Sequence, residues 1–241
     1  MLGFALHSSR STALHDASTA AAVPGQGSAV PWVAAIGRRF REHQILKFAG
    51  VCLFMWVFFS GYFHLLRHPA YPVTTMPLTA LDRAIPFQPQ MLAVYLSLWF
   101  YVGIPAGLAA GLRQALLYGA WAAVLCASGL AIFYFWPTAV PPTAIDLARH
   151  PSFAMLQGLD AAGNACPSLH VATALFAAAW VDRILVELRT PAALRWVNVA
   201  WFVAIAYSTV AVRQHVVLDV VGGCLLGGLF AWVSLRRRAR A

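Results

Sequence analysis

The chain has 241 residues, of which 61% are hydrophobic and only 10% are charged, and its mean hydropathy is +0.69. Soluble domains carry about 25% charged residues, so this composition excludes a disordered chain, a collagen-like fibre and an ordinary cytosolic enzyme. The formal net charge is +9, but the basic residues lie between apolar runs rather than in one patch, which indicates membrane topology and not nucleic-acid binding.

The first 46 residues differ from the rest of the chain. They are rich in Ser, Ala and Thr, and they end in a basic cluster around Arg38 and Lys47 with no long apolar run before it. We interpret residues 1–46 as a flexible cytoplasmic tail containing a short interfacial helix, and residues 47–241 as the membrane domain.

Six apolar runs follow the tail, and each approaches the roughly 20 residues that a helix needs to cross the bilayer. Gly103 and Pro105 inside the second run are tolerated in membrane helices. The sequence therefore predicts an all-α, polytopic bundle of six transmembrane helices. The runs cover about 48–66, 90–112, 115–136, 169–188, 193–212 and 216–235.

The distribution of basic residues predicts the orientation of these helices. If the N-terminus is inside, thirteen of the 17 basic residues lie on the inner side and four on the outer side. Positive charge concentrates on the cytoplasmic side of membrane proteins, so both termini are expected in the cytoplasm. The long connections 67–89 and 137–168 are then expected outside.

The first segment whose residues could take part in catalysis is Ala165-Cys166-Pro167-Ser168-Leu169-His170, at the start of the fourth run. Pro167 suits the first turn of a helix, and a helix N-terminus offers free N–H groups to a phosphate. Ser168 adds a hydroxyl donor, and His170 adds an imidazole. The alternative is a Pro-Ser helix start with an interfacial histidine.

The second segment, Arg213-Gln214-His215-Val216-Val217-Leu218-Asp219, begins the sixth run on the same predicted face. His215 and Asp219 are four residues apart, so they share one helix face. Asp219 can accept the Nδ1 proton and direct Nε2 outward, as a triad carboxylate does. Arg213 can bind phosphate oxygens. The alternative is a structural His–Asp pair, and Gly222-Gly223 indicates close helix packing rather than chemistry.

Together, the segments supply the parts that phosphoryl transfer needs, namely a nucleophile, an acid and positive charge. Two alternatives stay open: His170, His215 and Asp219 could bind iron or zinc, and the two histidines could ligate haem. We expect no metal and no other cofactor, because Asp219 is better placed to orient His215.

These motifs resemble those of the type 2 phosphatidic acid phosphatase superfamily. Its second signature, Pro-Ser-x-His, is matched by residues 167–170, and the end of its third signature, His-x3-Asp, by residues 215–219. The order of the motifs and their common membrane face strengthen the resemblance, which covers about 70–235.

The resemblance implies a mechanism. His215 attacks phosphorus and forms a phosphohistidine, Asp219 orients His215, and His170 protonates the leaving group. Water or a second alcohol then takes the phosphoryl group, while Ser168 and Arg213 hold its oxygens without a metal.

The sequence departs from the phosphatase pattern in its cations. The first signature, a Lys followed by Arg-Pro, is absent, and Lys47 is the only lysine. Thr209 stands where the third signature usually carries Arg, and Leu169 replaces the usual Gly. Arg213 is the expected substitute for the missing charge.

Two further segments, residues 81–87 and 136–142, resemble the branch that contains inositol phosphorylceramide synthases. That branch often has Arg directly after Pro-Pro, where this chain has Thr143, so Arg149 is the nearest candidate for a second phosphate-binding cation. Asp82 and Tyr95 are expected to make structural or outer-loop contacts.

We expect an integral protein of a bacterial plasma membrane, with its active site outside. Its predicted function is hydrolysis of a phosphomonoester or pyrophosphate of a lipid at the outer leaflet, and its predicted partners are the bilayer and that lipid phosphate. The alternatives are a phosphotransferase that moves a phospho-head-group onto a lipid alcohol, and a non-catalytic transporter or scaffold.

Overall fold

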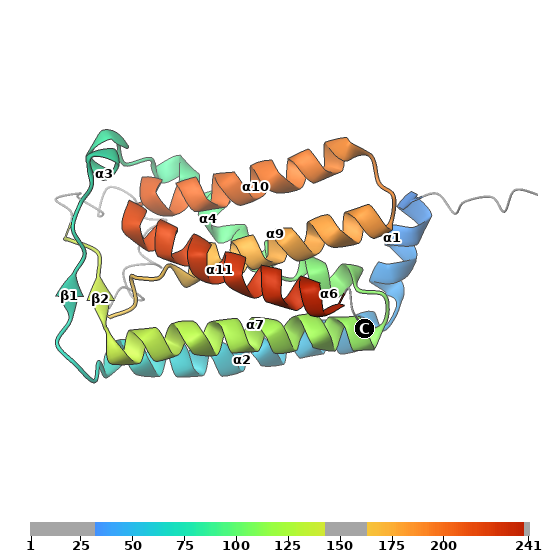
Figure 1. Cartoon of the computed structure of the whole chain (residues 1–241), viewed down its shortest axis with the longest axis horizontal. Coiled ribbons are helices and arrows are strands. Elements are labelled where there is room, and N and C mark those ends of the chain that lie inside the picture. Colours follow the sequence, from blue (N-terminus) through green and yellow to red (C-terminus); the bar gives the residue numbers. More distant parts are fainter. Residues whose placement is uncertain (1–31, 143–162, 239–241) are drawn as a thin grey trace, which may run out of the picture. The chain divides into compact units, whose positions relative to one another are not determined.

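The computed structural model describes residues 32–142 and 163–238, and all structural statements concern this part of the chain. It forms a bundle of helices with a small parallel strand pair at one end (Figure 1). In chain order the elements are α1 (Trp32–Arg41), α2 (Gln44–Arg67), β1 (Thr74–Thr75), α3 (Ala80–Ala84), η1 (Pro89–Met91), α4 (Leu92–Leu96), α5 (Leu98–Tyr101), α6 (Ile104–Leu108), α7 (Leu112–Phe135), β2 (Thr138–Ala139), α9 (Leu169–Glu187), α10 (Ala192–Ala211) and α11 (Val217–Arg238).

Within residues 32–142 and 163–238, six helical segments are long and apolar enough to cross a bilayer, which confirms the predicted all-α membrane fold. The chain is therefore an integral membrane protein. Every segment overlaps one predicted run, and the largest differences are at the start of the first segment and at the end of the second, four residues each. The segments are Gln44–Arg67, Pro89–Leu108, Leu112–Phe135, Leu169–Glu187, Ala192–Ala211 and Val217–Arg236.

The sequence predicted one regular helix for the second span. The span is instead a series of short helical pieces, η1, α4, α5 and α6. The Ser97 hydroxyl donates to the Val94 carbonyl at 2.6 Å at the first break, and such bonds compete with the helical ladder. The next break falls at Gly103, just before Pro105, which has no N–H to donate. The span ends at Leu108, four residues before the predicted end.

The predicted boundary at residue 46 falls inside α2, which begins at Gln44. Before it, α1 packs on α6. A Cβ added to Gly107 would lie only 2.7 Å from the ring of Phe40. The Lys47 ammonium donates to the carbonyls of Arg39, Gly107 and Ala109 at 2.8, 3.2 and 2.9 Å. The packed body therefore includes α1, whose basic residues fit the interfacial helix that the sequence suggested.

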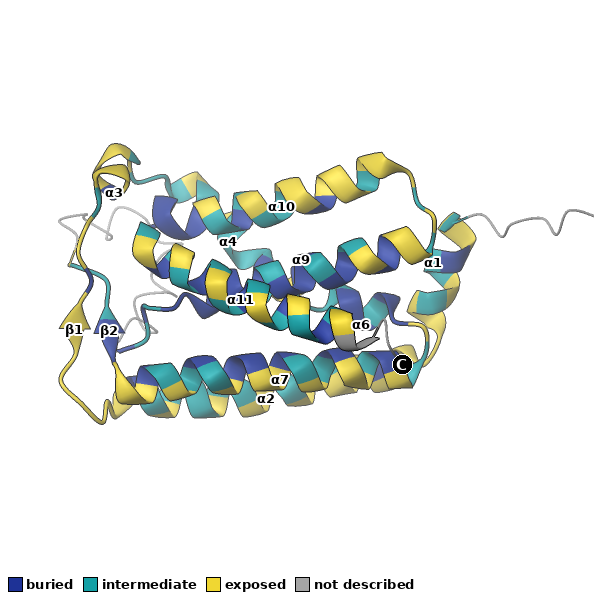
Figure 2. Ribbon diagram, viewed as in Figure 1, coloured by how far each residue is buried: buried dark blue, intermediate teal, exposed yellow. Residues whose placement is uncertain are grey.

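The helix at the centre of the bundle is α9, which packs against α7, α10 and α11 (Figure 1). In its most apolar stretch 67% of the residues are buried, against 6% in α2, which lies at the periphery (Figure 2). A Cβ on Gly227 would lie 2.3 Å from the Ala172 carbonyl oxygen, so α9 and α11 touch through their backbones. Such contact is typical of small residues in membrane helices.

One end of the bundle, which we call the histidine end, carries α3, the strand pair and the N-termini of α9 and α11 (Figure 1). The opposite end, with α1 and Lys47, is called the lysine end. At the histidine end β1 pairs in parallel with β2, so that Thr74 lies opposite Thr138. Thr138 also forms a parallel bridge with Asn164, which fixes the approach of the chain to α9.

Candidate active site

The loop that carries His215 is shaped by the way α10 ends. The N–H of Gln214 donates to the Thr209 carbonyl, and the N–H of Arg213 to the Val210 carbonyl, both at 3.0 Å. This is the Schellman arrangement that closes a helix C-terminus, and the N–H of His215 adds a third bond, to Thr209, at 3.1 Å. The main chain of His215 is thereby fixed against α10.

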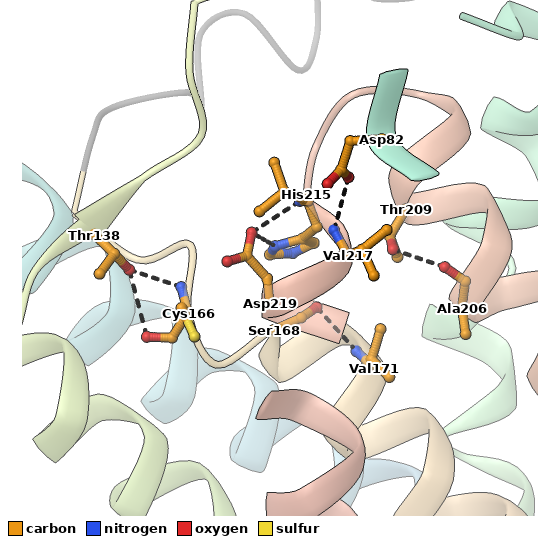
Figure 3. A network of polar contacts seen from close by, with 11 residues as sticks. Asp82, Thr138, Cys166, Ser168, Val171, Ala206, Thr209, His215, Val217 and Asp219 are labelled. Carbon is orange, nitrogen blue, oxygen red and sulfur yellow. Dashed lines mark hydrogen bonds and ion pairs between the residues drawn. The ribbon is translucent and has the colours of Figure 1, made fainter. Parts of the chain in front are cut away.

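His215 and Asp219 face each other, but not from one helix face as predicted: His215 lies in the loop before α11, which begins at Val217, and Asp219 lies in the first turn of that helix (Figure 3). The Nδ1 atom of His215 lies 3.5 Å from Oδ2 of Asp219, and the same oxygen accepts the N–H of Val216 at 2.9 Å. Asp219 is fully buried. Hydrogen bonds in ligand-free catalytic sites are often long and tighten on binding. The carboxylate is thus positioned to orient the ring through Nδ1, leaving Nε2 for chemistry.

His170 lies in the first turn of α9 and is held from the side of α4. Its Nε2 is 3.0 Å from the Tyr95 carbonyl oxygen, and its ring stacks on the Tyr95 ring with centroids 4.0 Å apart. A carbonyl can only accept, so Nε2 carries the hydrogen. The Nδ1 atom is therefore the nitrogen of His170 that can exchange a proton with a ligand.

The N-termini of α9 and α11 are joined directly, because the N–H of Ser168 donates to the Asp219 carbonyl at 2.9 Å. Gly223 permits this approach, since a Cβ there would lie 2.5 Å from the Ser168 carbonyl oxygen. The predicted packing role of the glycines is confirmed. The Ser168 hydroxyl accepts the N–H of Val171 at 3.2 Å (Figure 3), so it caps α9 in this structure, and Pro167 precedes the cap instead of occupying the first turn.

Asp82 ties α3 to the start of α11 (Figure 3). Its Oδ2 accepts the N–H and the hydroxyl of Thr79 at 2.8 and 2.6 Å, and its Oδ1 accepts the N–H of Val217 at 2.8 Å. Burial alone would raise the pKa of Asp82, but the bonds from Thr79 and Val217 and the nearby Arg213 outweigh it and lower that pKa. The expected structural role of Asp82 is confirmed.

Arg213 also binds the segment that contains α3, through main-chain carbonyl groups. Its Nη1 and Nη2 atoms donate to the carbonyls of Asp82 and Ile85 at 2.9 and 2.7 Å. Its backbone has φ 62°, in the left-handed region that non-glycine residues rarely occupy. The structure thus assigns the guanidinium to backbone carbonyls rather than to an open phosphate seat. Arg149, the other predicted cation, lies outside the described residues.

A cavity of about 640 Å³ connects the two predicted motifs. Both His170 and His215 line it at the histidine end, and it extends between α2, α7 and α9 as far as Lys47. Its walls are mainly aliphatic and aromatic. Both predicted histidines thus line one cavity, whereas Ser168 and Arg213 are not among the residues that line it.

The cavity is also lined by Asn164 and Gln214, polar residues to which the sequence motifs assigned no role. Each lies close in sequence to a motif, but nothing in the local pattern tells which way its side chain points. Next to Asn164, the N–H of Cys166 donates to the Thr138 hydroxyl at 2.7 Å (Figure 3). Burial, with a smaller contribution from Asp219, raises the pKa of the Cys166 thiol to about 11, so it is protonated at neutral pH.

In a comparison with known protein families, residues 115–241 match the model of the PAP2 superfamily. The chain belongs to the PAP2 superfamily. The matched region begins in α7 and includes both motifs. No curated protein and no solved structure matches the chain. PAP2 membership makes this membrane protein a phosphoric ester hydrolase or a related phosphotransferase.

Proposed function

We propose that this PAP2 protein hydrolyses a phosphomonoester or pyrophosphate of a membrane lipid through a phosphohistidine at His215. The observation that carries the proposal is the cavity, which places both imidazoles at one end of a long apolar volume. A phosphate head group at the histidines would leave its hydrocarbon chain among the apolar walls between α2, α7 and α9. Such walls accept a hydrocarbon chain from the bilayer without exposing it to water.

In the first step, Nε2 of His215 attacks phosphorus and the bond from phosphorus to the lipid oxygen breaks. Asp219 holds Nδ1 and stabilises the positive charge that forms on the ring. The leaving oxygen takes a proton from Nδ1 of a protonated His170, whose Nε2–H stays on the Tyr95 carbonyl.

In the second step, a water molecule gives a proton to Nδ1 of His170 and attacks the phosphohistidine. The nitrogen–phosphorus bond breaks, which releases inorganic phosphate and regenerates the neutral imidazole of His215 and the protonated imidazole of His170. Each histidine therefore acts twice, and the proton balance closes within the pair.

We further propose that the histidine end faces the outer leaflet of a plasma membrane and that both termini lie in the cytoplasm. The basic residues of α1 and of the α9–α10 connection lie at the lysine end, which agrees with the positive-inside rule.

A second candidate is a phosphotransferase, in which a lipid alcohol replaces water in the second step. Both segments that resemble inositol phosphorylceramide synthases contact the site. Asp82, from the first segment, caps α11, and Thr138, from the second, binds the main chain of Cys166. Water and an alcohol attack in the same way, so only the product separates the two functions.

The experiment is a phosphate-release assay of the purified protein against phosphatidate, phosphatidylglycerol phosphate, isoprenyl phosphate and isoprenyl pyrophosphate, each with and without alcohol acceptors. Hydrolysis predicts phosphate release without an acceptor. Transfer predicts an acceptor-dependent product. His215→Asn should abolish either activity, and His64→Asn, at an exposed histidine of α2, should retain it. Failure of all substrates with folded protein would refute both candidates.

A further inference from the structure

Buried polar side-chain atoms without a partner gather at the histidine end. Four such atoms occur among the described residues: Nε2 of Gln114, Nδ2 of Asn164, Nδ1 of His215 and Oδ1 of Asp219. An unsatisfied buried donor or acceptor costs about 1–3 kcal/mol, so native proteins retain few of them. Two of the four belong to the His215–Asp219 pair described above, and Asn164 contributes a third that the mechanism leaves unused.

The position of Asn164 is set by the main chain on both sides of it. The Asn164 backbone bridges to Thr138, and the N–H of Ala165 donates to the Thr138 carbonyl at 3.0 Å. Ser168, which binds the Asp219 carbonyl, follows four residues later, so Asn164 lies within about 14 Å of it along even a fully extended chain. The side chain is thus presented by a fixed scaffold.

Asn164 lines the same cavity as His170 and His215, and its side-chain nitrogen Nδ2 is buried without a partner. A carboxamide nitrogen can only donate, so the missing partner is an acceptor. The acceptor that the proposed reaction brings to this end of the cavity is a phosphoryl oxygen. Charge develops on the three equatorial oxygens during transfer, and aimed donors there are the main source of stabilisation.

We infer that Nδ2 of Asn164 donates a hydrogen bond to a non-bridging oxygen of the phosphoryl group that His215 attacks. This inference rests on the proposed phosphoryl transfer and adds a substrate-binding residue to it. As a neutral donor, Asn164 supplies part of the stabilisation for which the sequence analysis sought a cation. Removal of one such donor lowers kcat by about 10²–10³-fold in other enzymes.

The test uses the full-length protein with Asn164→Asp, Asn164→Ala and Asn164→Ser. The first keeps the shape but replaces the donor with a carboxylate oxygen that repels phosphate. Gln114→Glu is the matched control, because Gln114 also has an unpaired buried amide nitrogen but does not line the cavity. Two quantities are measured: the increase in thermal unfolding midpoint caused by inorganic phosphate or orthovanadate, and kcat and KM on an active lipid phosphate.

We expect all three Asn164 variants to unfold near the wild-type temperature without phosphate. Their kcat should be at least tenfold lower with a smaller change in KM, and phosphate should stabilise them much less, Asn164→Asp least of all. Gln114→Glu should keep the phosphate response. If Asn164→Asp does not fold, the Ala and Ser variants give the same comparison.

The outcomes separate this inference from the proposed function. Wild-type kcat and phosphate stabilisation in the Ala and Ser variants would overturn the inference and leave the proposed function intact. Asn164-dependent stabilisation by phosphate, without turnover of any lipid phosphate, would support the inference and refute the proposed function. Equal losses in Gln114→Glu and the Asn164 variants would overturn the inference, because they would reflect a general effect of changing a buried amide.

Discussion

Replacement of Asp82 by Ala removes a carboxylate that holds two helix N-termini at once. The capping box with Thr79 starts α3, and the bond from the Val217 N–H to Oδ1, 2.8 Å long, joins residues 135 positions apart in the chain. The substitution therefore breaks a local cap and the connection between α3 and the helix that carries Asp219.

The magnitude follows from these two losses. A helix cap contributes about 1 kcal/mol, and a buried N–H without a partner costs about 1–3 kcal/mol. We expect Asp82→Ala to lower the free energy of unfolding by about 2–4 kcal/mol on these figures. Because α11 begins beside His215, kcat should also fall by tenfold or more, with a smaller change in KM.

The assay combines thermal unfolding in detergent, followed by tryptophan fluorescence, with phosphate release. Thr79→Ala removes the local cap but keeps the bond to Val217, so it should lower the unfolding midpoint slightly and retain kcat. Asp182→Ala removes a partly exposed acid paired with Arg195 at 2.6 Å and should change both quantities little. An unchanged kcat in Asp82→Ala, or an equal loss in Thr79→Ala, would refute this reasoning.

The same contact predicts a pH dependence. The folded state lowers the pKa of Asp82, so its contribution to stability is fully present above the unfolded value of about 3.9. That contribution is lost as the pH falls through the lower folded-state pKa. The difference in unfolding free energy between wild type and Asp82→Asn should therefore shrink as the pH is lowered below 4, and a constant difference would contradict the assignment.

Three further predictions concern the helix contact, the nucleophile and the thiol. In Gly227→Ala the Cβ would lie 2.3 Å from the Ala172 carbonyl oxygen, so the substitution should separate α9 from α11. It should markedly lower the unfolding midpoint and reduce kcat by a large factor. Gly228→Ala, whose Cβ would have its nearest contact at 3.7 Å, should preserve both quantities. His215→Asn should abolish turnover, and wild-type turnover should survive a chelator; loss of activity on chelation would reject the metal-free mechanism. In a variant that keeps Cys166 alone, alkylation by iodoacetamide followed by mass spectrometry should accelerate with pH up to about 11, and a rate that levels off near pH 8 would contradict that pKa.

Sequence by itself determined the features that depend on neighbouring residues. Apolar runs of about 20 residues predicted the six spans, because the length of a membrane helix is set by bilayer thickness. The four-residue spacing of His215 and Asp219 predicted their contact, although His215 lies in the loop before α11 and not on the helix face that the spacing suggested. Gly222 and Gly223 of α11 predicted close helix packing, because residues without a side chain let two helix backbones approach each other.

Tertiary structure alone decided which distant groups meet and which remain unpaired. Arg213 turns to the carbonyls of Asp82 and Ile85 because the end of α10 and the segment after β1 lie together only in the folded bundle. Asn164 lines the cavity because Thr138, 26 positions earlier, fixes its main chain. Hydrogen bonds between remote segments form once packing has brought their donors and acceptors together, and no local pattern in the sequence encodes that packing.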